Sequence, residues 1–84
     1  MSERAPTSQS DSLAGLPTLS QAARMIGVAP STLSRRRDIR FQRRGDRDYA
    51  LTRAEVFRLA DIYRKRGSVD IRRDLDALAE AVRR

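Results

Sequence analysis

Apolar residues recur with two different periods along the centre of this chain, and the change of period predicts its elements. Ala22, Ala23 and Ile26 have the spacing of one helical face. Before them, Thr18 begins a Thr-x-x-Gln capping box, and after them Gly27 is free to adopt the positive φ that ends a helix. The pattern therefore predicts a first helix between Thr18 and Gly27.

A second short helix is predicted directly after this turn. Pro30 suits its first turn, where the missing N–H of proline is not needed, and Leu33 is its clear core residue. The helix is expected to close with the three arginines of residues 35–37. Two short helices joined at a glycine, with the small Ala23 facing the partner helix, are typical of a helix-turn-helix, whose second helix can enter the major groove of DNA.

The chain then changes to a period of two. The alternation predicts two short strands, residues 39–44 and 47–51, around a turn at Gly45 and Asp46. The residues expected on the inner face of this hairpin are Phe41, Tyr49 and Leu51.

Helical spacing returns after the hairpin. Thr52 and Glu55 have the spacing of a second capping box, and a helix ending at Gly67 follows. Ser68 is expected to cap a final helix that runs to about Val82. The apolar stripe of the first of these two helices consists of Val56, Leu59, Ala60 and Tyr63.

The elements together predict a fold that is mainly α with a small β-hairpin. We expect a winged helix-turn-helix over residues 18–67 and a C-terminal amphipathic helix over residues 68–84. Residues 1–17 are rich in polar residues, Pro and Gly and show no apolar period, so they are expected to form a disordered arm.

Charge is concentrated on the predicted winged unit. The 84 residues include 18 Lys and Arg against 11 Asp and Glu, a net charge of +7. Residues 18–67 alone carry +8, with 13 basic against 5 acidic side chains. A localised excess of this kind is the electrostatic footprint expected of a protein that binds phosphate.

The absence of Cys and His narrows the possible chemistry. It excludes disulfides, thiolate and imidazole metal sites, and Ser-His or Cys-His nucleophile pairs, so we expect neither an enzyme nor a cofactor or metal. No apolar run has membrane-spanning length and no signal-peptide pattern is present. A cytoplasmic, nucleoid-associated protein is expected.

The exposed start of the second helix is the predicted reading surface. Arg35 is the best candidate for a base contact, because a guanidinium can bond O6 and N7 of guanine together. Arg36 and Arg37 are rotated by about 100° and 200° from Arg35 on a helix, so phosphate contact or solvation is expected for them. The predicted major-groove residues are Ser31, Thr32, Ser34 and Arg35.

Arginines also cluster at the hairpin turn, as a wing that lies along a minor groove would present them. The alternative is an exposed hairpin that charge keeps soluble. The residues expected to contact the DNA backbone are Arg36, Arg37, Arg40, Arg43, Arg44, Arg47 and Tyr49.

From Thr18 to about Lys65 the chain resembles the MerR/excisionase-like winged helix-turn-helix. The matching text is TLSQAARMIGVAPSTLSRRR and then RRGDRDYALTRAEVFRL. The resemblance implies that Arg35 and its neighbours read the major groove, that Arg47 touches the backbone, and that Tyr49 bonds phosphate or packs the wing. Arg36 departs from the family, which usually has an aromatic or apolar residue there. A similar module opens some ParA-like partition ATPases.

The final helix carries an apolar seam with spacings of four, three and four residues. Such a seam favours a homodimer that reads a palindrome. The alternative is that the helix packs on its own domain and completes a thin core. The seam consists of Ile71, Leu75, Leu78 and Val82.

The leading hypothesis is a protein that binds double-stranded DNA in a sequence-specific manner. It would act as a small transcriptional regulator without a ligand domain or small-molecule effector. An excisionase-type or DNA-partition factor is the alternative within DNA binding. A protein-interaction adaptor that acts through the C-terminal helix is the alternative from a different class.

Overall fold

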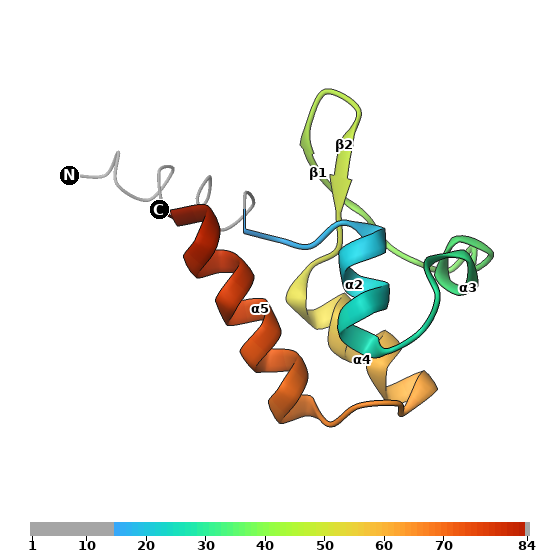
Figure 1. Ribbon diagram of the computed structural model, residues 1–84. Coiled ribbons are helices and arrows are strands. Elements are labelled where there is room, and N and C mark those ends of the chain that lie inside the picture. Colours follow the sequence, from blue (N-terminus) through green and yellow to red (C-terminus); the bar gives the residue numbers. More distant parts are fainter. Residues whose placement is uncertain (1–14, 84) are drawn as a thin grey trace.

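The computed structural model describes residues 15–83. It is a mainly helical small domain with a two-stranded antiparallel hairpin, and helices lie before and after the hairpin (Figure 1). The elements in chain order are α2 (Leu19–Ile26), α3 (Pro30–Ser34), β1 (Gln42–Gly45), β2 (Asp48–Ala50), α4 (Arg53–Tyr63) and α5 (Ser68–Arg83).

Local signals determine both ends of α2, as the sequence predicts. The N–H of Thr18 donates to Oε1 of Gln21 at 2.9 Å, and the N–H of Gln21 donates to Oγ1 of Thr18 at 3.2 Å, so the capping box is complete. Gly27 has a φ of 97° and its N–H donates to the carbonyl of Ala23 at 2.8 Å. A Cβ on Gly27 would also lie 3.2 Å from Cβ of Lys65, so both conformation and space favour glycine here.

The helix α3 is shorter than predicted. It spans Pro30–Ser34, with Arg35 as its C-cap residue, so Arg36 and Arg37 lie beyond the helix and not on its last turn. The expected closure of this helix by three arginines is therefore wrong. Beyond the helix, the side chain of Arg36 bonds Asp38 and the hydroxyl of Tyr63, and Tyr63 is too distant in the chain for a local pattern to reveal this contact.

The hairpin turn lies one residue later than predicted. Arg43 pairs with Tyr49 and Gly45 pairs with Asp48, which leaves Arg44 as an irregularity in β1 and places Asp46 and Arg47 in the turn. Arg47 has a φ of 62°, so an arginine, and not the glycine of the predicted turn, adopts the left-handed conformation. The predicted turn at Gly45 and Asp46 is corrected accordingly.

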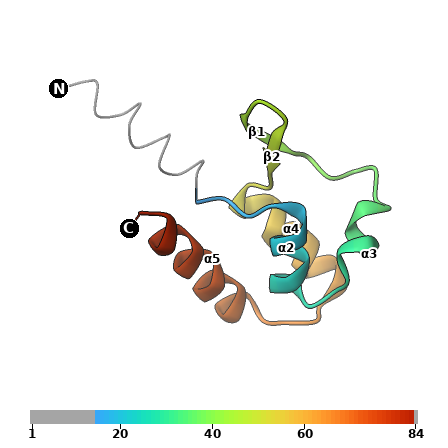
Figure 2. The same cartoon turned by 45° about the horizontal axis from the view of Figure 1, so that its top comes forward.

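The predicted inner face of the hairpin is wrong for its two aromatic residues. Leu51 is fully buried, but Phe41 and Tyr49 are 50% and 51% exposed. Figures 1 and 2 show the reason: the hairpin projects beyond the helices, so only its base reaches the core.

The first helix after the hairpin ends earlier than predicted. The helix α4 ends at Tyr63, and Arg64 caps it in the left-handed conformation with a φ of 54° and an N–H bonded to the carbonyl of Ala60 at 2.7 Å. Gly67 therefore does not end α4. Its carbonyl instead accepts the N–H of Ile71 at 3.2 Å, which makes Gly67 the residue from which α5 begins.

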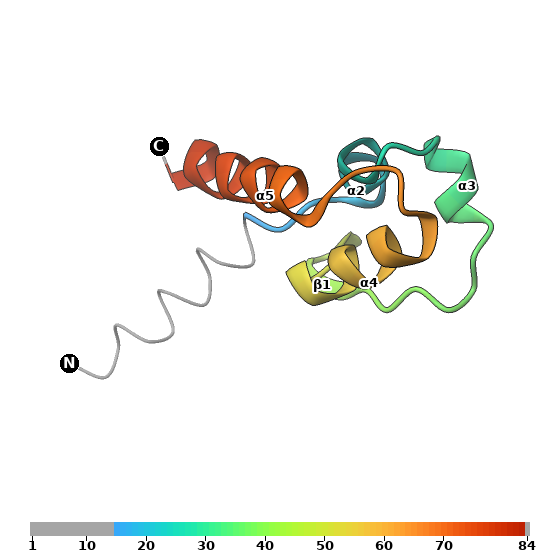
Figure 3. The same cartoon turned by 90° about the horizontal axis from the view of Figure 1, so that it is seen from below.

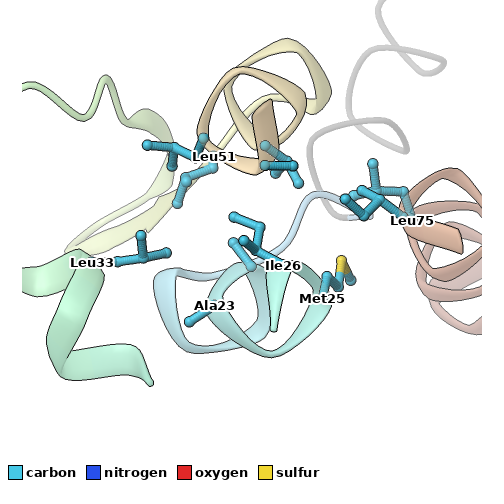
Figure 4. Packing of buried hydrophobic residues seen from close by; sticks show 11 residues of the cluster. Ala23, Met25, Ile26, Leu33, Leu51 and Leu75 are labelled. Atoms are coloured by element: carbon cyan, nitrogen blue, oxygen red, sulfur yellow. The ribbon is translucent and has the colours of Figure 1, made fainter. Parts of the chain in front are cut away.

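One hydrophobic core joins α2, α3, α4 and α5. Figure 3 shows α2 and α5 above α4, with α3 at the far end from α5, and Figure 4 shows Ile26 and Met25 of α2 in the centre of the packing. The predicted stripe on α4 is confirmed, since three of its residues are buried and Tyr63 is partly buried. The buried cluster consists of Ala22, Ala23, Met25, Ile26, Leu33, Leu51, Val56, Leu59, Ala60, Ile71 and Leu75.

The predicted disordered arm is too long at its C-terminal end. Pro17 is buried, and its carbonyl accepts the N–H of Leu51 at 2.9 Å, so this part of the chain belongs to the fold. Residues 1–14 of the arm lie outside the described residues.

Candidate nucleic-acid interface

The packing of α3 determines which of its residues face outward. Leu33 is fully buried against the rest of the core, so Ser31, Ser34 and Arg35 are turned to the surface. The hydroxyl of Ser34 donates to the carbonyl of Ser31 at 3.0 Å, whereas Thr32 is half-buried. The exposed polar side of the predicted reading helix therefore consists of Ser31, Ser34 and Arg35.

Arg36 is held within the fold. Its Nε and Nη2 donate to the two carboxylate oxygens of Asp38 at 2.9 and 2.7 Å, and its guanidinium carbon lies 5.7 Å from the centre of the Tyr63 ring. The guanidinium thus packs near the aromatic ring of α4 as well as pairing with a carboxylate. The hydrogen bonds from Arg36 lower the pKa of Asp38 to about 2, and Asp38 in turn raises the pKa of Arg36.

A buried carboxylate ties the segment after α3 to α4. Glu55 is 7% exposed, and its Oε2 accepts the backbone N–H of Arg40 at 3.1 Å. Arg58 donates from Nε to Oε1 of Glu55 at 3.0 Å and from Nη2 to the carbonyl of Asp38 at 3.2 Å. The hydrogen bond from Arg58 is the main cause of the lowered pKa of Glu55.

This use of Glu55 changes the predicted second capping box. Oγ1 of Thr52 accepts the N–H of Glu55 at 3.1 Å, as a cap requires. The carboxylate of Glu55 does not return to Thr52 but binds Arg40 and Arg58. The acidic residue at the start of α4 thus positions the segment that carries the exposed arginines.

Arg44 has a structural role that the sequence did not indicate. Its Nη2 donates to Asp48 at 2.9 Å and its Nη1 to the carbonyl of Leu16 at 2.7 Å, and its side chain is only 17% exposed. Arg43, the next residue toward α3, is 65% exposed, and its guanidinium lies 3.7 Å from the carboxylate of Asp46, which is 93% exposed. Arg44 therefore joins the hairpin to the segment before α2, whereas Arg43 remains accessible.

Four arginines near the hairpin and α3 have no hydrogen bond or ion pair from their guanidinium groups to any described residue. All four are exposed, and they fall within the thirteen residues 35–47, from the end of α3 through the connecting segment to the hairpin turn. Figure 1 shows this part of the chain on the side of α2 that faces away from α5 and above it. The four residues are Arg35, Arg37, Arg40 and Arg47.

The predicted dimer seam divides into a buried and an accessible half. Ile71 and Leu75 are enclosed in the core of their own chain, and Leu78 packs partly against it. Val82 is 45% exposed. The first half of the seam therefore completes the core, and Leu78 and Val82 are what remains accessible to a second copy.

Besides the role of Arg44, two further features of this surface were not predicted from the sequence. One is the network around Glu55, Asp38 and Arg58, although the acidic residue two positions after Arg36 was a signal. The sequence also placed Phe41 inside, and no local signal corrects this, because Arg40 outside and Phe41 inside is the ordinary alternation of a strand.

Within residues 15–83 no group of three or more acidic side chains is arranged to hold a metal ion, and no helix there is long and apolar enough to cross a membrane. No protein-family model, curated protein or solved structure matches the chain.

Proposed function

We propose that this chain binds double-stranded DNA in a sequence-specific manner as a winged helix-turn-helix. In this proposal α2 and α3 form the helix-turn-helix, and the β1–β2 hairpin is the wing. The protein acts as a small transcriptional regulator that occupies an operator without a small-molecule effector.

The observation that carries the proposal is the division into two groups of the arginines between the end of α3 and α4. The first group donates hydrogen bonds to carboxylates and carbonyls within the fold and consists of Arg36, Arg44 and Arg58. The arginines without such partners that lie between residues 35 and 47 are presented on α3, the connecting segment and the hairpin turn. These four exposed arginines within thirteen residues concentrate positive charge on this part of the surface, and the DNA backbone supplies regularly spaced anions that can neutralise it.

The geometry suggests different roles for these cations. Arg35 is beside the exposed Ser31 and Ser34 of α3, so it is assigned to base edges in the major groove. Arg37 and Arg40 follow on the connecting segment and Arg47 is in the hairpin turn, so they are assigned to backbone phosphates.

The left-handed backbone of Arg47 supports the same assignment. A non-glycine residue in this conformation costs roughly 1–2 kcal/mol, and Gly is the ordinary solution in such a turn. A strained residue with an exposed cation in the hairpin turn is expected where function requires that side chain.

An excisionase-type role in DNA recombination is a second candidate. It is favoured by the burial of Ile71 and Leu75, which removes half of the seam through which a symmetric regulator would dimerise. Such a factor binds adjacent direct repeats as separate copies, whereas a dimeric regulator reads a palindrome.

Selection of random duplexes by the purified protein tests the proposal. A recovered motif is expected, and Arg35→Ala should relax the selection at one position while the rest of the motif is retained. Direct repeats would favour the recombination role and a palindrome the dimeric regulator. Unselected output with binding that does not respond to salt would contradict DNA binding and leave the protein-interaction adaptor.

A further inference from the structure

Phe41 and Tyr49 form an exposed aromatic pair on the hairpin. Their ring centres are 6.5 Å apart and the ring planes meet at 71°, which is an edge-to-face contact. Each side chain keeps half of its surface accessible to solvent. Single exposed apolar residues are ordinary, but two large rings in mutual contact outside the core form a small apolar surface that needs an explanation.

The charges around the pair select its partner. Arg40 immediately precedes Phe41, and Arg43 is the direct cross-strand partner of Tyr49. Asp48, which precedes Tyr49, is already paired with Arg44, so the charge beside the rings left without a partner among the described residues is that of Arg40. A second hairpin of the same kind would bring this charge against its own copy, which is repulsive. A polyanion with apolar groups between its charges fits both features, and nucleic acid has that composition.

The angle between the rings decides which part of a nucleic acid they suit. Consecutive unpaired bases stack on aromatic rings that can lie parallel to them. Two rings at 71° cannot both do so. An edge-to-face pair presents an apolar wedge instead, and this shape suits the C–H groups of the deoxyribose units between successive phosphates.

We propose that Phe41, supported by Tyr49, is an apolar contact to the deoxyribose wall of duplex DNA beside the phosphates that Arg40 and Arg47 bind. This inference rests on the proposed function and adds a contact that does not depend on charge. It gives the hairpin both an ionic and an apolar component of affinity.

The salt dependence of duplex binding separates these two components. Phe41→Ala should weaken binding about tenfold, since it removes a ring from an apolar contact. The slope of log affinity against log salt should stay unchanged, because no counterion release is lost. Val69→Ala, which shortens a residue 77% exposed on α5, is the matched control and should leave affinity unchanged.

Variants of Tyr49 test the support that it provides. Tyr49→Phe keeps the ring contact and should retain most of the affinity, whereas Tyr49→Ala should lose it. The double variant Phe41→Ala/Tyr49→Ala should lose less than the sum of the single losses, because the two rings act as one unit. Phe41 lies outside the buried cluster, so thermal unfolding of Phe41→Ala should match that of the unchanged protein.

Tyrosine fluorescence reports the contact directly. The chain has two tyrosines and no tryptophan, so Tyr63→Phe leaves Tyr49 as the single fluorophore. Duplex binding should protect Tyr49 from quenching by acrylamide. Failure of the unchanged protein to bind any duplex would overturn the proposed function itself. Normal duplex binding by Phe41→Ala, or a loss seen only with single strands, would overturn this inference alone.

Discussion

The carboxylate of Glu55 accepts the backbone N–H of Arg40 at 3.1 Å, although the two residues are fifteen positions apart in the chain. Glu55 is buried at the start of α4, and Arg40 lies at the entrance to the hairpin. Arg58 holds the same carboxylate and also binds the carbonyl of Asp38. The connecting segment that carries Arg37 and Arg40 is thereby fastened to the helical core.

Replacing Glu55 with Ala should therefore destabilise the domain. The change leaves the N–H of Arg40 and the guanidinium of Arg58 without their acceptor, and losses of this kind cost about 2 kcal/mol. Urea unfolding followed by circular dichroism measures the change. Glu55→Gln keeps one acceptor oxygen and should lose less; equal losses for both variants would show that the hydrogen bond to Arg40 is unimportant.

Arg36 and Arg37 are neighbours with opposite expected roles. Arg36→Ala removes the contacts with Asp38 and Tyr63, so it should lower the urea midpoint. Arg37→Ala removes an exposed cation without a partner and should leave the midpoint unchanged while it weakens duplex binding at every sequence. The comparison uses unfolding and binding measured on both variants. The assignment is wrong if Arg37→Ala unfolds more easily than Arg36→Ala.

The Arg36–Asp38 pair predicts a loss of stability in acid. The pKa of Asp38 is lowered from 3.8 to about 2 by its hydrogen bonds from Arg36. A carboxyl group with a lowered folded pKa contributes stability that is fully present above its unfolded pKa and is lost as the pH falls through the folded pKa. The contribution of Asp38 should therefore disappear between about pH 4 and pH 2.

Urea midpoints measured across this pH range test the prediction. Asp38→Asn should remove part of the acid dependence. Asp46→Asn is the control. Asp46 is 93% exposed, and its ion pair with Arg43 is long, at 3.7 Å, so it should contribute little to stability. Identical acid profiles for the unchanged protein and Asp38→Asn would contradict the role of the pair.

Two arginines have a left-handed backbone, but only one of them lies in the proposed DNA interface. Comparing their variants separates the effect of backbone strain on stability from the effect of the side chain on DNA binding. Arg47 in the hairpin turn and Arg64 at the end of α4 have φ values of 62° and 54°. Replacing either with Gly should stabilise the domain by about 0.5–1 kcal/mol, because glycine adopts this conformation without a steric penalty. Arg47→Gly should weaken duplex binding, whereas Arg64→Gly should not.

Thermal unfolding and duplex titration of these two variants provide the comparison. Full affinity of Arg47→Gly would remove Arg47 from the proposed interface. A loss of stability in both variants would show that the left-handed conformations are not strained.

Features that depend on neighbouring residues could be predicted from the sequence. Thr18 and Gln21 signalled the start of α2, and Gly27 signalled its end, because capping and positive φ are local properties. The helical stripe of α4 was equally readable from its spacing. The mainly helical class with one hairpin followed from these elements.

Features that depend on distant residues could not be predicted in the same way. The pairing of Arg36 with Tyr63 and of Arg44 with Leu16 joins residues 27 and 28 positions apart, and no local pattern encodes such contacts. The exposure of Phe41 depends on how far the hairpin projects beyond the helices. Periodicity shows which residues share a face, but the position of that face relative to the core is a tertiary property.

The salt dependence of affinity for a selected duplex tests the central claim most directly. Three phosphate contacts, by Arg37, Arg40 and Arg47, predict a slope of log affinity against log salt of about −3. Arg37→Ala and Arg47→Gly should each reduce its magnitude by about 0.9, and Arg36→Ala should leave it unchanged. A slope near zero, or an equal reduction by all three variants, would contradict the division of the arginines into those that hold the fold and those that hold DNA.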